Sequence, residues 1–196
     1  GDLPFIGPNC YGFANFFDRV ALWPDQVTGS QLERGVAFIA QSGTISISMM
    51  SQRRSLPLGY VISLGNQQRL AAEDLIRYCA EDERVSAIGL YLEGILDLPK
   101  FIAAIDYART LGKPIALIKA GSSEKGRSAA NTHTGALTGS DSLHDALFER
   151  LGIARCETLS SLVETLKLLH CFGPLPSKRI LVFGASGGDM AMVSDS

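Results

Sequence analysis

Short apolar runs alternate with amphipathic stretches along most of the chain. Before Arg34 the pattern is irregular, and the segment Gly7-Pro8-Asn9-Cys10-Tyr11-Gly12 carries residues typical of turns. After Arg34 the alternation is regular, so the apolar runs predict buried strands and the stretches of helical periodicity predict helices. The predicted strands cover 36–40, 59–64, 86–92, 114–119, 153–156 and 179–183; the predicted helices run from Thr44 to about Ser55, over 71–81, 99–109, 142–151 and 160–172, and from Asp189 onward.

Continuous apolar strands that alternate with helices are typical of a parallel sheet covered on both faces. The sequence therefore predicts a doubly wound α/β fold over residues 35–172. Gly173-Pro174-Leu175-Pro176 has the composition of a linker, and the glycine-rich turn that follows indicates the start of a second, similar domain within 173–196. Because the chain starts without methionine and its last helix has only about two turns, we expect it to be part of a longer polypeptide.

The composition narrows the classes of function. Hydrophobic residues make up 46% of the chain, charged residues 19%, and the formal net charge is −2, so we expect no bulk attraction to nucleic acid or to anionic lipid. The four cysteines form no CxxC pair and no zinc-binding spacing, which favours reduced thiols in a cytoplasmic protein without a bound metal. No apolar run approaches the ~18 residues of a membrane span, and no signal peptide is visible.

Four polar segments directly follow predicted strands, and α/β folds gather reactive groups at the carboxyl ends of their strands. These segments are Gln41-Ser42-Gly43-Thr44, Gly65-Asn66, Glu93-Gly94 and the loop that carries His133. Ser42 is placed to cap the helix that follows, and the N–H groups of the same helix start, together with two hydroxyls, would suit an anion. The two roles are compatible. Gly187-Gly188 repeats the pattern before the last predicted helix.

His133 lies among small and hydroxylated residues from Ser128 to Leu137, so a reacting group could approach its imidazole closely. An imidazole is a nucleophile whose charge is tunable near neutral pH. A lone loop histidine is more often inert, and a loop glutamate is more often merely solvated. If Glu93 reaches His133, it would hold one ring N–H and leave the other nitrogen free to react.

Other charged residues carry weaker signals. Lys119 and Lys125 flank the His133 loop and could offer positive charge to a phosphate, but we expect them to be ordinary surface lysines. His144 and His170 lie on predicted helices and receive no role. The chain has no GxxxxGK[ST], GxSxG or GxGxxG motif, which argues against a P-loop, an α/β-hydrolase elbow and a dinucleotide site.

Six segments occur in one order along the chain: Gly7-Pro8-Asn9-Cys10-Tyr11-Gly12, Ala40-Gln41-Ser42-Gly43-Thr44, Ser63-Leu64-Gly65-Asn66, Leu90-Tyr91-Leu92-Glu93-Gly94-Ile95, Lys119-Ala120-Gly121 and Thr132-His133-Thr134-Gly135-Ala136-Leu137. In these segments, and from about Gly7 to its last residue, the chain resembles the NDP-forming acyl-CoA synthetases, which are relatives of succinyl-CoA synthetase. Each segment alone is weakly specific, but six in family order are strongly so. The resemblance implies a flavodoxin-like domain at 35–172, preceded at 1–34 by the tail of, and linker from, a CoA-binding domain.

Enzymes of that family convert an acid, CoA and ATP into acyl-CoA, ADP and phosphate by way of an acyl phosphate and a phosphohistidine. The resemblance implies that His133 is the phosphorylated residue and that Glu93 orients it. Thr132 stands where the family usually has serine, which keeps a hydroxyl. The residues expected to bind phosphate lie at two helix starts: Ser42, Gly43, Thr44, Gly187 and Gly188. The residues expected on the side of the acid and CoA lie in two turns: Asn9, Cys10, Gly65 and Asn66.

The resemblance also implies partners. CoA, ATP or ADP, and Mg²⁺ would be bound mainly by a CoA-binding domain and an ATP-grasp domain, in cis or on another subunit of a homo-oligomer. The 196 residues alone are therefore not expected to turn over. Two alternatives from the same superfamily stay open: a protein lysine acetyltransferase-like enzyme and a regulatory module that binds acyl-CoA. The presence of His133 favours a synthetase, because the acetyltransferase relatives lack the phosphorylated histidine.

Overall fold

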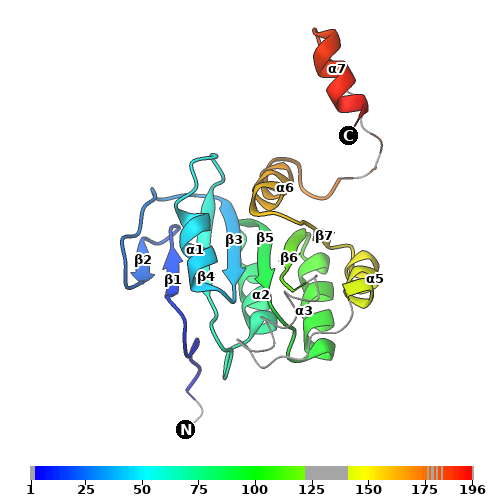
Figure 1. Cartoon of the computed structure of the whole chain (residues 1–196). Helices are drawn as coiled ribbons and strands as arrows, with labels where there is room; N and C mark the ends of the chain where they lie inside the picture. Colours follow the sequence, from blue (N-terminus) through cyan, green and yellow to red (C-terminus); the bar gives the residue numbers. More distant parts are fainter. Residues whose placement is uncertain are drawn as a thin grey trace.

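The computed structural model describes residues 3–121, 141–175, 177, 179, 181 and 183–195. Its strands form one sheet in the order β2-β1-β4-β3-β5-β6-β7 (Figure 1). The strands are β1 (Gly12–Asn15), β2 (Val20–Leu22), β3 (Gly35–Ala40), β4 (Leu58–Ser63), β5 (Val85–Leu92), β6 (Ile115–Lys119) and β7 (Ala154–Arg155). The helices are α1 (Gly43–Met50), α2 (Ala72–Glu81), α3 (Leu98–Thr110), α5 (Asp141–Leu151), α6 (Leu159–Phe172) and α7 (Gly187–Ser194).

The strands β4, β3, β5, β6 and β7 pair in parallel. Every residue of β3, β4 and β6 is buried, as expected for strands that are covered on both faces. The predicted doubly wound α/β fold is confirmed, and between 35 and 172 the strands and helices lie close to the predicted ranges. Helix α1 differs, because it ends at Met50 rather than near Ser55.

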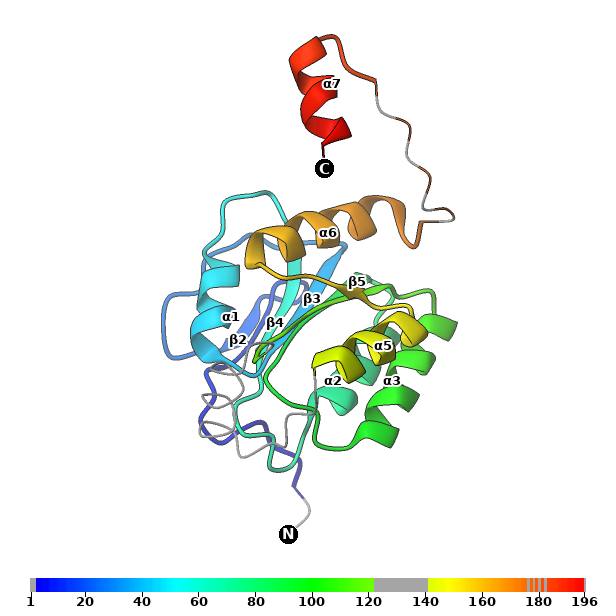
Figure 2. The same ribbon diagram turned by 45° about the vertical axis from the view of Figure 1, so that its right-hand side comes forward.

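Helices cover the two faces of the sheet in two layers (Figure 2). Helices α1 and α6 lie on one face, and α2, α3 and α5 lie on the other. The side chains of β3 alternate between these layers: Val36, Phe38 and Ala40 pack with the α1 and α6 side, whereas Ala37 and Ile39 pack with the α2 and α3 side. The two-residue period of the strand therefore supplies both halves of the core.

The N-terminal segment is part of the sheet, so the expectation that residues 1–34 are irregular is wrong for β1 and β2. β1 pairs antiparallel with β4, with Phe13 opposite Ile62, and β2 pairs antiparallel with β1. These strands are only four and three residues long, which gives them too little alternation to be read from sequence. The sheet is consequently mixed, with an antiparallel edge on a parallel core.

The C-terminal segment contains the predicted last helix, α7, whose N-cap is Ser186. Arg179, Leu181 and Phe183 are not in a strand, and the intervening positions of the predicted strand 179–183 lie outside the described residues. Among the helices that the structure describes, none is both long and apolar enough to cross a membrane.

Arg84 joins the N-terminal edge to the start of β5. Its guanidinium donates to both carboxylate oxygens of Asp18, at 2.7 and 3.1 Å, and to the carboxylate of Asp82, with Nη2 2.9 Å from Oδ2. It also lies 4.7 Å from the centre of the Phe17 ring. The hydrogen bonds from the Arg84 side chain are the main reason that the pKa of Asp82 falls to about 2.

This ion pair predicts how stability depends on pH. A carboxylate whose folded pKa is depressed stabilises the fold above its unfolded pKa of ~3.9, and it loses that contribution as the pH falls. We therefore expect the free energy of unfolding to fall between pH 4 and pH 2. Asp82→Asn should lower stability at pH 7 and flatten the fall, as measured by urea denaturation across that window. The exposed Glu149 gives the control Glu149→Gln. Equal pH dependence for Asp82→Asn and wild type would contradict this account.

Candidate functional site

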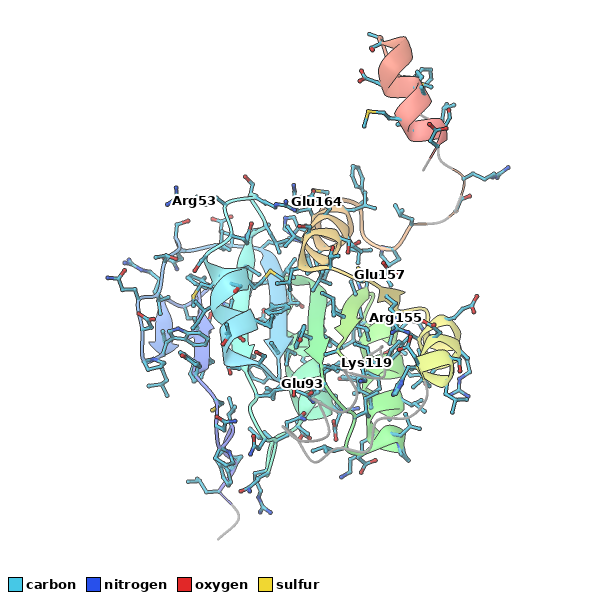
Figure 3. All side chains as sticks on the ribbon, in the orientation of Figure 1. Arg53, Glu93, Lys119, Arg155, Glu157 and Glu164 are labelled. Atoms are coloured by element: carbon cyan, nitrogen blue, oxygen red, sulfur yellow. The ribbon has the colours of Figure 1, made fainter. Side chains whose placement is uncertain are left out.

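The carboxyl ends of β3, β5 and β6 meet at one edge of the sheet. Parallel pairing aligns these ends, because Ala40 lies opposite Tyr91 and Leu92 lies opposite Lys119. Figure 3 shows Glu93 and Lys119 together at this edge. The loops that follow the three strands are therefore neighbours in space, as the sequence predicts for polar segments after consecutive parallel strands.

Ser42 begins helix α1, as predicted. Its Oγ accepts from the N–H of Ile45 at 3.4 Å, and its carbonyl accepts from the N–H of Ser46 at 3.1 Å. The N–H groups of Gly43 and Thr44 belong to the first turn, where a helix has no intrahelical acceptors for them. The helix start therefore has both the cap and the backbone donors that an anion site requires.

Gly43 lies directly against the ring of Tyr11. A Cβ atom on Gly43 would lie 2.3 Å from Cδ2 of Tyr11, so any side chain there would require the Tyr11 ring to move. The N–H of Tyr11 donates to Oγ of Ser63 at 3.1 Å, and its ring centre is 5.5 Å from that of Trp23. The N-terminal segment is thus held against the helix start, and Gly43 is required for this close approach.

Gln41 connects the start of α1 to the turn after β5. Its side chain is buried, with only 6% of the residue exposed. Oε1 accepts from the N–H of Glu93 and from the N–H of Gly94, the latter at 3.0 Å, while Nε2 donates to the carbonyl of Gly94 at 2.7 Å. Sequence reasoning missed this contribution, because the partners of Gln41 lie more than fifty residues away.

Lys119 is buried, so the expectation of an ordinary surface lysine is wrong. Only 5% of the residue is exposed, and Nζ donates to the carbonyl of Glu93 at 2.8 Å and to that of Ala120 at 2.6 Å. Burial, which disfavours the charged form, lowers the pKa of the ammonium. The sequence signal for this burial was the position of Lys119 at the end of an apolar strand, where a side chain lies at the buried end of the sheet.

The residues expected on the side of the acid and CoA form a second cluster. Nδ2 of Asn9 donates to Oδ1 of Asn66 at 3.3 Å, and the N–H of Asn66 donates to the carbonyl of Pro8 at 2.9 Å. Gly65 has a positive φ of 60°, and a Cβ there would lie 2.2 Å from the Pro8 carbonyl. Cys10 follows and is half-buried. The structure therefore brings together two turns that are separated by more than fifty residues.

Three further groups of predicted residues remain: His133, Lys125 and the Gly187-Gly188 pair. His133 and Lys125 lie outside the described residues. Gly187 and Gly188 form the first turn of α7, and Oγ of Ser186 accepts from the N–H of Asp189 at 3.5 Å. Helix α7 lies beyond the opposite end of the sheet from Glu93 (Figures 1 and 3). The role of this second helix start stays a prediction.

A cavity of 460 Å³ lies beside the edge, where β6 and β7 end and α5 begins. Lys119, Asp141, Asp145 and Arg155 line it. Arg155 pairs with both acids, and its Nη2 lies 2.6 Å from Oδ1 of Asp141. Within the described parts of the chain, no group of three or more histidine, cysteine or acidic side chains is arranged to hold a metal ion.

Comparison with known proteins identifies similar sequences. The family described as "Succinyl-CoA ligase like flavodoxin domain" matches residues 33–169. The ADP-forming acetate–CoA ligase of Methanocaldococcus jannaschii is 31% identical, over 100% of this chain and 27% of its own length. The alpha subunit of ADP-forming acetate–CoA ligase II of Pyrococcus furiosus is 34% identical, over 98% of this chain and 42% of its own. The chain thus spans less than half the length of these relatives, and both are ligases, which does not favour the acetyltransferase or regulatory alternatives.

A solved structure agrees with this similarity. The dinucleotide-forming acetyl-coenzyme A synthetase 1 of Ca. Korarchaeum cryptofilum, in complex with phosphate and ADP, superposes with a TM-score of 0.86 at 28% identity. The match covers 97% of this chain and 41% of that one. The arrangement of strands and helices described above is therefore shared with that protein.

The contact between Gly43 and Tyr11 gives a test of the helix start. Gly43→Ala should destabilise the fold by about 1–3 kcal/mol, because its methyl group overlaps the Tyr11 ring. Displacement of that ring should also change the fluorescence of Trp23, which is the single tryptophan of the sequence. Gly187→Ala is the matched control, since a Cβ there meets no atom within 4 Å. Unchanged stability and emission for Gly43→Ala would show that this contact is not maintained.

Proposed function

The chain belongs to the family of succinyl-CoA ligase like flavodoxin domains, and from this premise we propose that it is the phosphohistidine-carrying part of an NDP-forming acyl-CoA synthetase. The observation that carries the proposal is the bond between Gln41 and the Glu93–Gly94 turn. It joins the backbone of Glu93 to the residue that precedes Ser42, which supports the proposed pairing of an orienting glutamate with a phosphate-binding helix start. Phosphoryl transfer depends mainly on such positioning and on electrostatic stabilisation.

The described residues on both sides of the His133 segment support its placement at the same edge. On one side, the N–H of Ala120 donates to the carbonyl of Leu92 at 2.8 Å, so the chain leaves the sheet next to Glu93. On the other side, Asp141 begins α5 and lines the same cavity as Lys119. A segment that starts and ends at this edge is well placed to present His133 there.

In the proposed reaction, a ring nitrogen of His133 attacks the γ-phosphorus of the nucleoside triphosphate, the bond from that phosphorus to the bridging oxygen breaks, and the nucleoside diphosphate leaves. A carboxylate oxygen of the acid then attacks the phosphorus, the N–P bond breaks, and acyl phosphate and the neutral imidazole result. The thiolate of CoA attacks the acyl carbon, and phosphate leaves. Phosphohistidine carries close to two negative charges, which the first turn of α1 would stabilise through the N–H groups of Gly43 and Thr44.

The rest of the proposed enzyme would supply the other binding sites. The Korarchaeum synthetase binds phosphate and ADP, and we propose ADP or ATP, CoA and Mg²⁺ as the ligands of the whole protein here. We assign the nucleotide and Mg²⁺ to an ATP-grasp domain and CoA to a CoA-binding domain, in a cytoplasmic homo-oligomer. Asn9, Cys10, Gly65 and Asn66 would face the acid and CoA, and Gly187 and Gly188 would provide the second phosphate cradle.

Labelling with [γ-³²P]ATP tests this function. The full-length protein, incubated with the labelled nucleotide and Mg²⁺, should gain label that is lost in acid and stable in base. His133→Asn should abolish the label and the formation of acyl-CoA. His144→Asn is the matched control and should keep both, because His144 lies on helix α5 and stacks on Phe148. Acid-labile label on the His133→Asn protein would exclude the assignment, and acyl-CoA binding without any label would favour the regulatory alternative.

The role of Glu93 can be tested in the same assay. Glu93→Gln keeps the shape of the side chain but removes its charge, so it would hold the ring N–H of His133 less strongly and less uniquely than the carboxylate does. Since misplacement of a reacting group costs about 10²-fold in rate, we expect labelling to slow by about that factor. Quenched-flow measurement of the labelling rate gives the result, and a rate equal to wild type would remove Glu93 from the mechanism.

A further inference from the structure

The turn formed by Glu93 and Gly94 is held by side chains rather than by backbone pairing. All four of its backbone polar groups bond to Gln41 or Lys119. Oε1 of Gln41 accepts from both N–H groups, and Nε2 donates to the Gly94 carbonyl at 2.7 Å. Nζ of Lys119 donates to the Glu93 carbonyl at 2.8 Å. The two peptide groups that flank the Cα of Glu93 are therefore fixed on both sides.

These two side chains are themselves fixed. Both residues are buried. Gln41 directly follows β3 and Lys119 is the last residue of β6, and these two strands flank β5. The backbone N–H of Gln41 also donates to the Tyr91 carbonyl at 3.0 Å, and Nζ of Lys119 donates to the Ala120 carbonyl at 2.6 Å. A turn at a strand end usually bonds to water, whereas this one is bonded from inside the protein.

Gln41 and Lys119 are adjacent in the sequence to the segments that carry the proposed reacting groups. Ser42, which caps α1, follows Gln41 directly, and the segment that carries His133 follows Lys119. Fixing the turn to both neighbours holds the backbone of Glu93 in place relative to the start of α1 and the end of β6. A shift of about 1 Å in such a group is enough to reduce catalysis about 10²-fold.

We propose that Gln41 and Lys119 are positioning residues, which act on the reaction through Glu93. This inference rests on the proposed function, because it assigns the two residues to the orientation of the phosphorylated histidine. Neither side chain is placed on the substrate. Both hold the backbone from which Glu93 projects.

Gln41→Met and Lys119→Met test the proposal in the full-length protein. Methionine has a similar length and no strong hydrogen-bonding groups, so each change removes the bonds to the turn. We expect the rate of histidine phosphorylation to fall about 10- to 100-fold in both variants. The KM for ATP should stay within about twofold of wild type, because the changes do not remove interactions that bind ATP equally in the ground state and the transition state. Lys119→Arg, which keeps charge and donors, should restore part of the rate.

Two matched controls separate positioning from loss of stability. Lys113 precedes the opposite end of β6 and donates to the Val85 carbonyl at 2.6 Å and the Asp82 carbonyl at 3.1 Å. Gln52 bonds to the backbone of Leu56 and Arg54 in the loop after α1. Lys113→Met and Gln52→Met lose comparable bonds away from Glu93. Their melting temperatures should fall as well, but their phosphorylation rates should equal wild type.

A double-mutant cycle gives the decisive result. If Gln41 and Lys119 act through Glu93, then Gln41→Met or Lys119→Met added to Glu93→Gln should slow labelling by less than about twofold further. If the rate reductions of the single variants multiply in the double variants, the proposal is overturned. Labelling at the wild-type rate in both Gln41→Met and Lys119→Met would also overturn it. An unlabelled wild-type protein would instead show that the proposed function itself fails. If Gln41→Met does not fold, Gln41→Glu, which keeps an acceptor oxygen and loses the Nε2 group that donates to Gly94, takes its place in the cycle.

Discussion

The parallel pairing of β3 with β5 and of β5 with β6 is the constraint on which the candidate site depends. It aligns three strand ends, so the residues that follow them become neighbours although they are distant in the sequence. Gln41, Glu93 and Lys119 meet only for this reason. Helices on both faces keep the strands buried and leave the strand ends as the accessible edge, as in other doubly wound folds.

The buried polar groups at this edge are stable because they form hydrogen bonds with one another. A buried lysine or glutamine is costly unless its polar atoms are bonded, and unbonded backbone groups in a buried turn cost about 1–3 kcal/mol each. Gln41, Lys119 and the Glu93–Gly94 turn satisfy one another, so each makes the burial of the others acceptable. The same bonds remove freedom from the backbone of Glu93. The backbone of Glu93 is therefore held by buried groups.

The sequence predicted well those features that depend on local pattern. The strands between 35 and 156 have continuous apolar runs, and helix α1 begins at its predicted cap, Ser42. Features that depend on contacts between distant residues could not be predicted from the sequence. The strands β1 and β2 are too short to show a period, and they exist because β4 offers them an edge. The burial of Lys119 depends on a carbonyl that lies 26 residues away. In the candidate site, the positions of Ser42 and Glu93 could be predicted because both follow predicted strands. The hydrogen bonds of Gln41 and Lys119 that hold the Glu93 turn could not be predicted.

The central claim is that this chain carries phosphate on His133, and locating that phosphate tests it most directly. The full-length protein would be incubated with ATP and Mg²⁺, quenched in base, digested with trypsin and analysed by tandem mass spectrometry. Cleavage after Arg127 and Arg150 yields a peptide that contains both His133 and His144, so fragmentation must distinguish them. The account predicts one phosphoryl group on His133, lost when an acid and CoA are added. Phosphate on His144 or on a hydroxyl of the peptide, or acyl-CoA formed with no phosphopeptide, would contradict it.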